Sequence, residues 1–112
     1  MSLHNFQPTE IPIDLNALMG EVQAWIHYES FPADDIALRF HHRLTQIHPF
    51  PNGNGRFSRT AADLLIVRLG GKRFTWGRVN LVDPSTTRRE YIDTLRQADD
   101  HDIAPLRAFA RS

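Results

Sequence analysis

The chain has 112 residues, of which 41% are hydrophobic and 23% charged, and its 13 basic residues are balanced by 13 acidic ones. This length suits one domain that buries roughly two-thirds of its unfolded surface, and the balanced charge gives no reason to expect a nucleic acid or an anionic membrane as partner. The absence of cysteine excludes disulfides, thiolate catalysis and cysteine-ligated metal, and no apolar run approaches the roughly 18 residues of a membrane span.

Residues 1–13 contain Pro8 and Pro12 and show little periodicity, which indicates an extended N-terminal segment ahead of a core domain over 14–112. They also lack the basic-then-apolar layout of a signal peptide, so we expect a cytoplasmic protein. Asp14 is the expected N-cap of a helix over 15–28. Its apolar residues recur at the 3.6-residue period: Leu18, Val22, Trp25 and Ile26. Phe31-Pro32 ends this helix.

Two further helices are expected in the middle of the chain. The first begins near Ala33, with acidic residues favourable in its first turn, and ends close to His48 because Pro49 disfavours helical geometry there. Its buried stripe is Ile36, Phe40, Leu44 and Ile47. The next helix covers about 56–69, is strongly apolar, and ends at Gly70-Gly71, which supplies a left-handed stop.

The C-terminal third is predicted to be a connector followed by two helices. Phe74 and Trp76 in the connector are expected to pack onto the helices, and Asp83-Pro84-Ser85 opens a helix to about Ala98. A short helix follows Asp102. Thr87 and Glu90 have the spacing of a capping box at a helix start. No strand pair or repeat is evident, so the predicted fold class is an all-α helical bundle.

The candidate functional residues for binding a phosphate lie in the run from His48 to Arg59: His-Pro-Phe-Pro-Asn-Gly-Asn-Gly-Arg-Phe-Ser-Arg. Its glycines let backbone N–H groups approach an anion, and a helix that starts where the loop ends adds free amides and a favourable dipole. Arg56 and Arg59 are three residues apart, so they share a face of the first turn. Cations there are unfavourable unless an anion is bound. The scattered histidines lack the i, i+4 spacing of a helical metal site, and adjacent His41 and His42 point in different directions.

This run resembles the signature of the Fic family, His-x-Phe-x-Asp/Glu-Gly-Asn-Gly-Arg-x-x-Arg, and matches seven of its eight specified positions. The surrounding sequence is similar to the family's mobile mystery protein B branch, in which Phe74-Thr75-Trp76-Gly77 and the helix over 83–95 recur. The resemblance implies a Fic-type helical bundle with the signature loop between two central helices. It also implies transfer of AMP from ATP to a Ser, Thr or Tyr hydroxyl of a target protein.

The resemblance assigns a role to each matching residue. His48 is the general base, Gly53, Asn54 and Gly55 form the anion hole, Arg56 and Arg59 hold the distal phosphates, and Phe50 anchors the loop. Asn52 departs from the pattern, because the family places an acidic Mg²⁺ ligand there and an amide oxygen is a weaker ligand for a hard cation. Three outcomes stay open: Mg²⁺ binds more weakly, the donor transfers UMP, phosphocholine or phosphate instead, or the domain binds nucleotide or protein with little catalysis.

Regulation and assembly are also implied by the resemblance. Many Fic proteins carry an inhibitory Ser/Thr-x-x-x-Glu-Gly/Asn helix, and the run from Thr86 fails that pattern at Tyr91. A separate inhibitory antitoxin, as in bacterial toxin–antitoxin pairs, is therefore the expected regulator. Only the last part of the family's target-clamping flap can lie within residues 4–12. The missing preceding helices would leave apolar surface on the helix over 15–28, which favours homo-oligomers.

Overall fold

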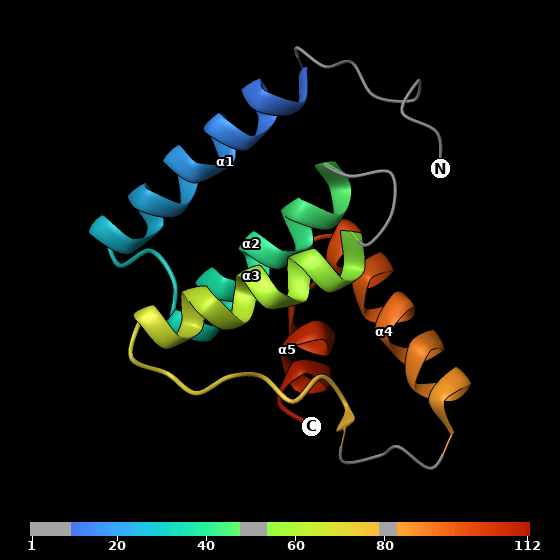
Figure 1. Cartoon of the computed structure of the whole chain (residues 1–112). Coiled ribbons are helices and arrows are strands. Elements are labelled where there is room, and N and C mark those ends of the chain that lie inside the picture. The colour runs from blue at the N-terminus through green and yellow to red at the C-terminus, as the bar shows by residue number, and fades with distance from the viewer. Residues whose placement is uncertain (1–9, 48–53, 79–82) are drawn as a thin grey trace.

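The computed structural model describes residues 10–47, 54–78 and 83–112, with the backbone alone for 10–12 and 54. These ranges contain helices and no strand, which confirms the all-α prediction for the described part of the chain. The helices are α1 (Glu10–His27), α2 (Ala33–Ile47), α3 (Asn54–Arg68), α4 (Pro84–Asp99) and α5 (Ala104–Ala110). Figure 1 shows α2 and α3 crossing at the centre, with α1 on one side and α4 and α5 on the other.

Helix α1 begins earlier than the sequence pattern indicated. It starts at Glu10, so residues 10–13 are helical rather than extended, and Asp14 lies inside the helix instead of capping it. Pro12 is compatible with this start because the N–H groups of a first helical turn have no partner within the helix.

Helices α2 and α3 match their predicted extents within two residues at each end. Asp34 and Asp35 occupy the first turn of α2, as expected. At the end of α3, the N–H of Gly70 donates to Val67 and the N–H of Gly71 donates to Ile66, which is the hydrogen-bond pattern of a Schellman motif. Gly70 has φ of +91°, so the predicted left-handed stop is confirmed.

Helix α4 is capped by Asp83, which accepts a hydrogen bond from the backbone N–H of Ser85 at 3.1 Å. The capping-box interpretation of Thr87 and Glu90 was wrong. Thr87 lies one turn inside the helix, where its hydroxyl donates back to the carbonyl of Asp83 at 3.2 Å. Asp83 prevails because Pro84 is pre-organised for the first helical position and has no N–H to satisfy.

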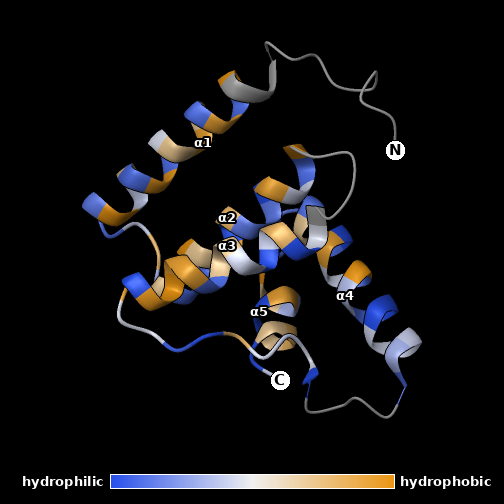
Figure 2. Cartoon of the chain, viewed as in Figure 1, coloured by the Kyte–Doolittle hydropathy of each residue, from blue (hydrophilic) through white to orange (hydrophobic). Residues whose placement is uncertain are grey.

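The core has two parts that meet along α2 and α3. One joins α1 to α2 through Leu18, Val22, Ile36 and Leu44. The other is aromatic and lies between α2, α3, the connector, α4 and α5; its members include Phe74, Trp76, Tyr91, Leu106 and Phe109. Phe74 and Trp76 are buried, as predicted. The C-terminal half of α3 is mostly hydrophobic (Figure 2), and its Leu64 and Val67 stay exposed.

Candidate phosphate site at the start of helix α3

The described residues place one half of the motif at the start of α3. Asn54 begins the helix, Gly55 and Arg56 follow in its first turn, and Arg59 lies one turn on. His48, Phe50, Asn52 and Gly53 lie outside the described residues, as does the side chain of Asn54. The helix start expected within the motif is therefore present, and the first amides of α3 are among the donors that a helix leaves free.

Arg59 turns back toward the first turn of its own helix. A Cβ atom added to Gly55 would lie 3.3 Å from a terminal guanidinium nitrogen (Nη1) of Arg59. The glycine therefore leaves room for the arginine head at the helix N-terminus. The guanidinium carbon of Arg59 also lies 5.2 Å from the centre of the Tyr91 ring, within the range of a cation–π contact. Arg59 is half-buried, whereas Arg56 is exposed.

The hydroxyl of Tyr91 forms a hydrogen bond with a buried histidine, His41. The Tyr91 hydroxyl and His41 Nε2 are 2.9 Å apart, and the centre of the His41 ring lies 4.7 Å from that of Trp76 with the two ring planes tilted by 44°. The pKa of His41 is lowered to about 4, mainly by burial and in smaller part by the nearby charge of Arg59. His41 is therefore neutral at pH 7. Burial also raises the pKa of Tyr91, which keeps its hydroxyl protonated.

The buried position of His41 was not predicted from the sequence, because His41 and the adjacent His42 were considered only as possible metal ligands. A signal was available: His41 follows Ala37 and Leu38 by one helical turn and precedes Leu44 by three residues, so it shares their buried face. A histidine on an apolar face needs a hydrogen-bond partner. Its partner, Tyr91, is fifty residues away and cannot be read from spacing.

A cavity of about 300 Å³ opens beside Arg59, and we refer to it as the arginine cavity. Its lining includes Arg59 from α3, Arg78 from the connector and Arg88 from α4, together with the aromatic rings of Trp76, Tyr91 and Phe109. Arg56 does not contribute to it. Of the two motif arginines, the fold brings only Arg59 to this cavity.

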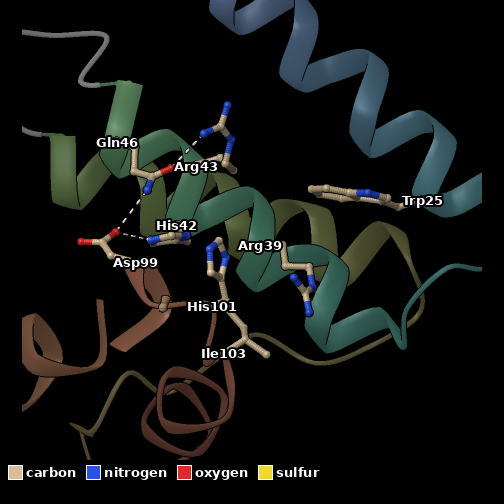
Figure 3. A pocket seen from close by; sticks show the side chains of 9 residues that line it. Trp25, Arg39, His42, Arg43, Gln46, Asp99, His101 and Ile103 are labelled. Atoms are coloured by element: carbon tan, nitrogen blue, oxygen red, sulfur yellow. Dashed lines mark hydrogen bonds and ion pairs between the residues drawn. The ribbon is translucent and has the colours of Figure 1, made fainter. Parts of the chain in front are cut away.

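A second, smaller cavity lies between α2 and the end of α4 (Figure 3). There His42 Nε2 lies 2.7 Å from a carboxylate oxygen of Asp99, which also accepts a hydrogen bond from Gln46 at 3.1 Å. Gln46 in turn accepts from Arg43 at 2.9 Å. The His42 and Gln46 hydrogen bonds hold Asp99 in its ionised form, so the pKa of its carboxyl is lowered. This polar chain joins the C-terminal ends of α2 and α4.

Neither a membrane span nor a metal-binding cluster is found in the described ranges. No helix there is long and apolar enough to cross a bilayer. Nor do three or more His, Asp or Glu side chains gather there in a way that could hold a metal ion. The expected Mg²⁺ ligand, Asn52, lies outside the described residues.

A helical domain with Gly55 and Arg56 in the first turn of a central helix has a counterpart among known families. A family model described as the Fic/DOC family matches residues 5–66, which include the whole motif. The chain belongs to this family, as the motif predicted. No solved structure matches it.

Similar curated proteins are each named protein adenylyltransferase Fic. Those of Culex quinquefasciatus and Aedes aegypti are 34% and 32% identical over 101 residues, and that of Drosophila virilis is 33% identical over 101. In each case the match covers 88% of this chain and 19% of the relative. The chain thus spans about a fifth of the length of these relatives. Because they are insect proteins, the expected bacterial origin stays a prediction.

Proposed function

We propose that this domain transfers AMP from ATP to a hydroxyl side chain of a target protein. The observation that carries the proposal is the position of Arg59, whose guanidinium lies over Gly55 at the N-terminal turn of α3. An arginine held there, against the helix dipole, is stabilised when a phosphate binds. The adenylyltransferase names of the relatives support the same activity.

The proposed reaction begins with loss of the target hydroxyl's proton to His48. The hydroxyl oxygen attacks the α-phosphorus of ATP and forms a new P–O bond. The bond from that phosphorus to the oxygen bridging to the β-phosphate breaks, and pyrophosphate leaves with the electron pair. The target then carries AMP as a phosphodiester, and His48 carries the proton. General-base assistance of this kind contributes about 10²–10⁴-fold in rate.

The phosphates are held by backbone amides and two arginines. We assign the amides of Gly53, Asn54 and Gly55 to the anion hole, because helix starts leave such donors free. Arg59 neutralises the distal phosphates from its place beside Tyr91, and Arg56 approaches them from the exposed face of the first turn. Phe50 anchors the loop between α2 and α3.

The residues at this site fit Mg²⁺ poorly. Its expected ligand is the neutral amide of Asn52, and none of the described residues that line the cavity beside Arg59 is Asp or Glu. A hard cation prefers carboxylate, phosphate and water oxygens. We therefore assign charge neutralisation to the arginines and expect a metal, where it binds, to rely on phosphate and water.

The test is transfer of label from α-labelled ATP to protein bands in a cell lysate. We expect His48→Ala to reduce labelling by about 100-fold or more. The matched control is His27→Ala, since His27 is exposed in the last turn of α1. Asn52→Asp is expected to increase labelling at low Mg²⁺ by restoring a carboxylate ligand. Equal labelling by His48→Ala and the unmodified protein would refute the assignment of the base.

Because Asn52 replaces the acidic Mg²⁺ ligand of the family, it favours two alternatives to AMP transfer from ATP. If another donor is used, labelled ATP gives no product while a UMP, phosphocholine or phosphate donor labels protein in a His48-dependent way. If the domain is a binding module, nucleotide binds tightly in calorimetry and no donor gives transfer. The Asn52→Asp variant separates the two, because a new carboxylate is expected to restore transfer from ATP only when the metal was limiting.

We further propose a homo-oligomer, an inhibitory antitoxin protein and a cytoplasmic location. The apolar side chains exposed on α1 support self-association: Ile13 is 64% exposed and Met19 46%. Light scattering after gel filtration tests this, and replacing both residues by Gln is expected to yield a monomer. The antitoxin rests on the family resemblance and is tested by co-purification from the native host.

A further inference from the structure

The arginine cavity gathers three cations from three separate parts of the chain. Arg59 belongs to α3, Arg78 to the connector and Arg88 to α4, and all three line one cavity of about 300 Å³. Arg59 belongs to the motif, whereas Arg78 and Arg88 lie well outside it. Residues so far apart in sequence come together only through the packing of the connector and α4 on α3.

Among the described residues, those that line the cavity supply no carboxylate to offset this charge. The residues that line the cavity include no Asp or Glu, and in the described part of the chain none of the three arginines forms an ion pair. Two arginines of α5 and its C-terminal end do form such pairs: Arg107 lies 2.7 Å from Asp35, and Arg111 lies 2.5 Å from Asp34. Three unpaired guanidinium groups around one cavity repel one another, and an anion bound between them reverses that interaction.

Aromatic side chains form part of the cavity wall, while Arg78 and Arg88 are exposed at its edge. Trp76, Tyr91 and Phe109 provide aromatic walls, which lower the local dielectric and strengthen the attraction between charges. The Tyr91 ring contacts the Arg59 guanidinium and is itself fixed by the buried His41. Arg59 therefore has a defined position, and its planar head can make bidentate hydrogen bonds to phosphate.

We propose that the arginine cavity binds the two terminal phosphates of the nucleotide donor and retains them as pyrophosphate after transfer, with Arg78 and Arg88 as anchors in addition to Arg59. This inference rests on the proposed function, because it extends the phosphate site at the start of α3. Its ligand is a polyphosphate anion, which the cavity recognises through charge and bidentate hydrogen bonding rather than through a base or sugar.

The test is calorimetric binding of sodium pyrophosphate, ATP and AMP to the full chain and its variants. We expect Arg78→Ala and Arg88→Ala each to weaken pyrophosphate and ATP by about tenfold, since a hydrogen bond to a charged group contributes about that much. AMP, which lacks the terminal phosphates, is expected to bind equally to all. Arg88→Lys keeps a charge without the fork and is expected to give an intermediate loss.

The matched control is Arg89→Ala. Arg89 is the next residue of α4, but it lies outside the cavity lining and donates to Thr86. Unchanged pyrophosphate affinity in the Arg78 and Arg88 variants overturns the proposal, as does an equal loss in Arg89→Ala, which would indicate a long-range charge effect. Pyrophosphate binding without transfer rejects the adenylyltransferase function alone. Transfer without any effect of Arg78 or Arg88 rejects the cavity assignment alone.

Discussion

At the scale of single residues, His41 makes the stability of the fold depend on pH. Burial lowers its pKa from 6.5 to about 4 in the folded chain. Between these pH values the unfolded chain binds a proton that the folded chain does not, so stability is lost as the pH falls from 6.5 toward 4. The full shift corresponds to roughly 3 kcal/mol.

Urea unfolding at several pH values between 7.5 and 4.5 measures this effect. His41→Gln is expected to flatten the pH dependence, because glutamine can still bond to Tyr91 but does not titrate. His27→Gln, on the exposed end of α1, is expected to retain the slope of the unmodified protein. The lowered pKa of Asp34 and Asp99 affects stability only at lower pH, where those carboxyls protonate. An unchanged slope in His41→Gln would contradict the assignment.

A substitution at Gly55 is expected to weaken phosphate binding without lowering the stability of the fold. Gly55→Ala places a methyl group 3.3 Å from the Arg59 guanidinium, so that side chain has to move. Alanine is also the better helix former, by up to about 1 kcal/mol. We therefore expect weaker binding of ATP, by several-fold, together with unchanged or higher resistance to urea. Loss of both properties in the same variant would show that Gly55 is needed for folding rather than for the position of Arg59.

At the scale of elements, the end of α3 depends on the left-handed geometry of Gly70. Gly70→Ala is expected to destabilise the chain by about 1–2 kcal/mol, since φ of +91° strains a residue with a Cβ. Gly20→Ala is the matched control. Gly20 lies within α1 with nothing within 4 Å of its added Cβ, so that variant is expected to gain up to about 1 kcal/mol. Differential scanning calorimetry of both variants measures whether the melting temperature falls in Gly70→Ala and rises in Gly20→Ala.

At the scale of the whole molecule, Arg111 joins the C-terminus to two other parts of the chain. Its guanidinium pairs with Asp34 at the start of α2 and donates to the carbonyls of Lys72 and Arg73 in the connector. It also stacks on Phe74 at 4.2 Å. This set of contacts holds α5 and the connector against α2.

Arg111→Ala is expected to cost about 1–2 kcal/mol, more than an ordinary surface ion pair, because several acceptors lose their donor together. Arg96→Ala removes only an exposed contact with Asp93 at 3.8 Å and is expected to cost less than about 0.5 kcal/mol. Guanidinium unfolding of the two variants compares them directly. Similar losses in both would indicate that the Arg111 contacts add nothing to stability.

Much of the helical architecture was predictable from local pattern. The α2 stripe, the Gly70-Gly71 stop and the Asp83-Pro84 start are each encoded within a few residues, because periodicity, backbone freedom and capping are local properties. The start of α1 was predicted too late, since proline is tolerated in a first turn and gives no sharp boundary. Motif spacing likewise predicted the family and the place of Arg56 and Arg59 at a helix start, whereas Gly55 was expected in the preceding loop and lies in the helix.

The sequence by itself thus determined the fold class, the family and the half of the site that lies within one helical turn. Only the tertiary structure decided which distant residues meet there. The pairing of His41 with Tyr91 and the meeting of Arg78 and Arg88 with Arg59 depend on how the connector and α4 pack against α2 and α3. Hydrophobic packing of this kind is non-directional and carries no fixed sequence spacing, so such contacts cannot be read along the chain.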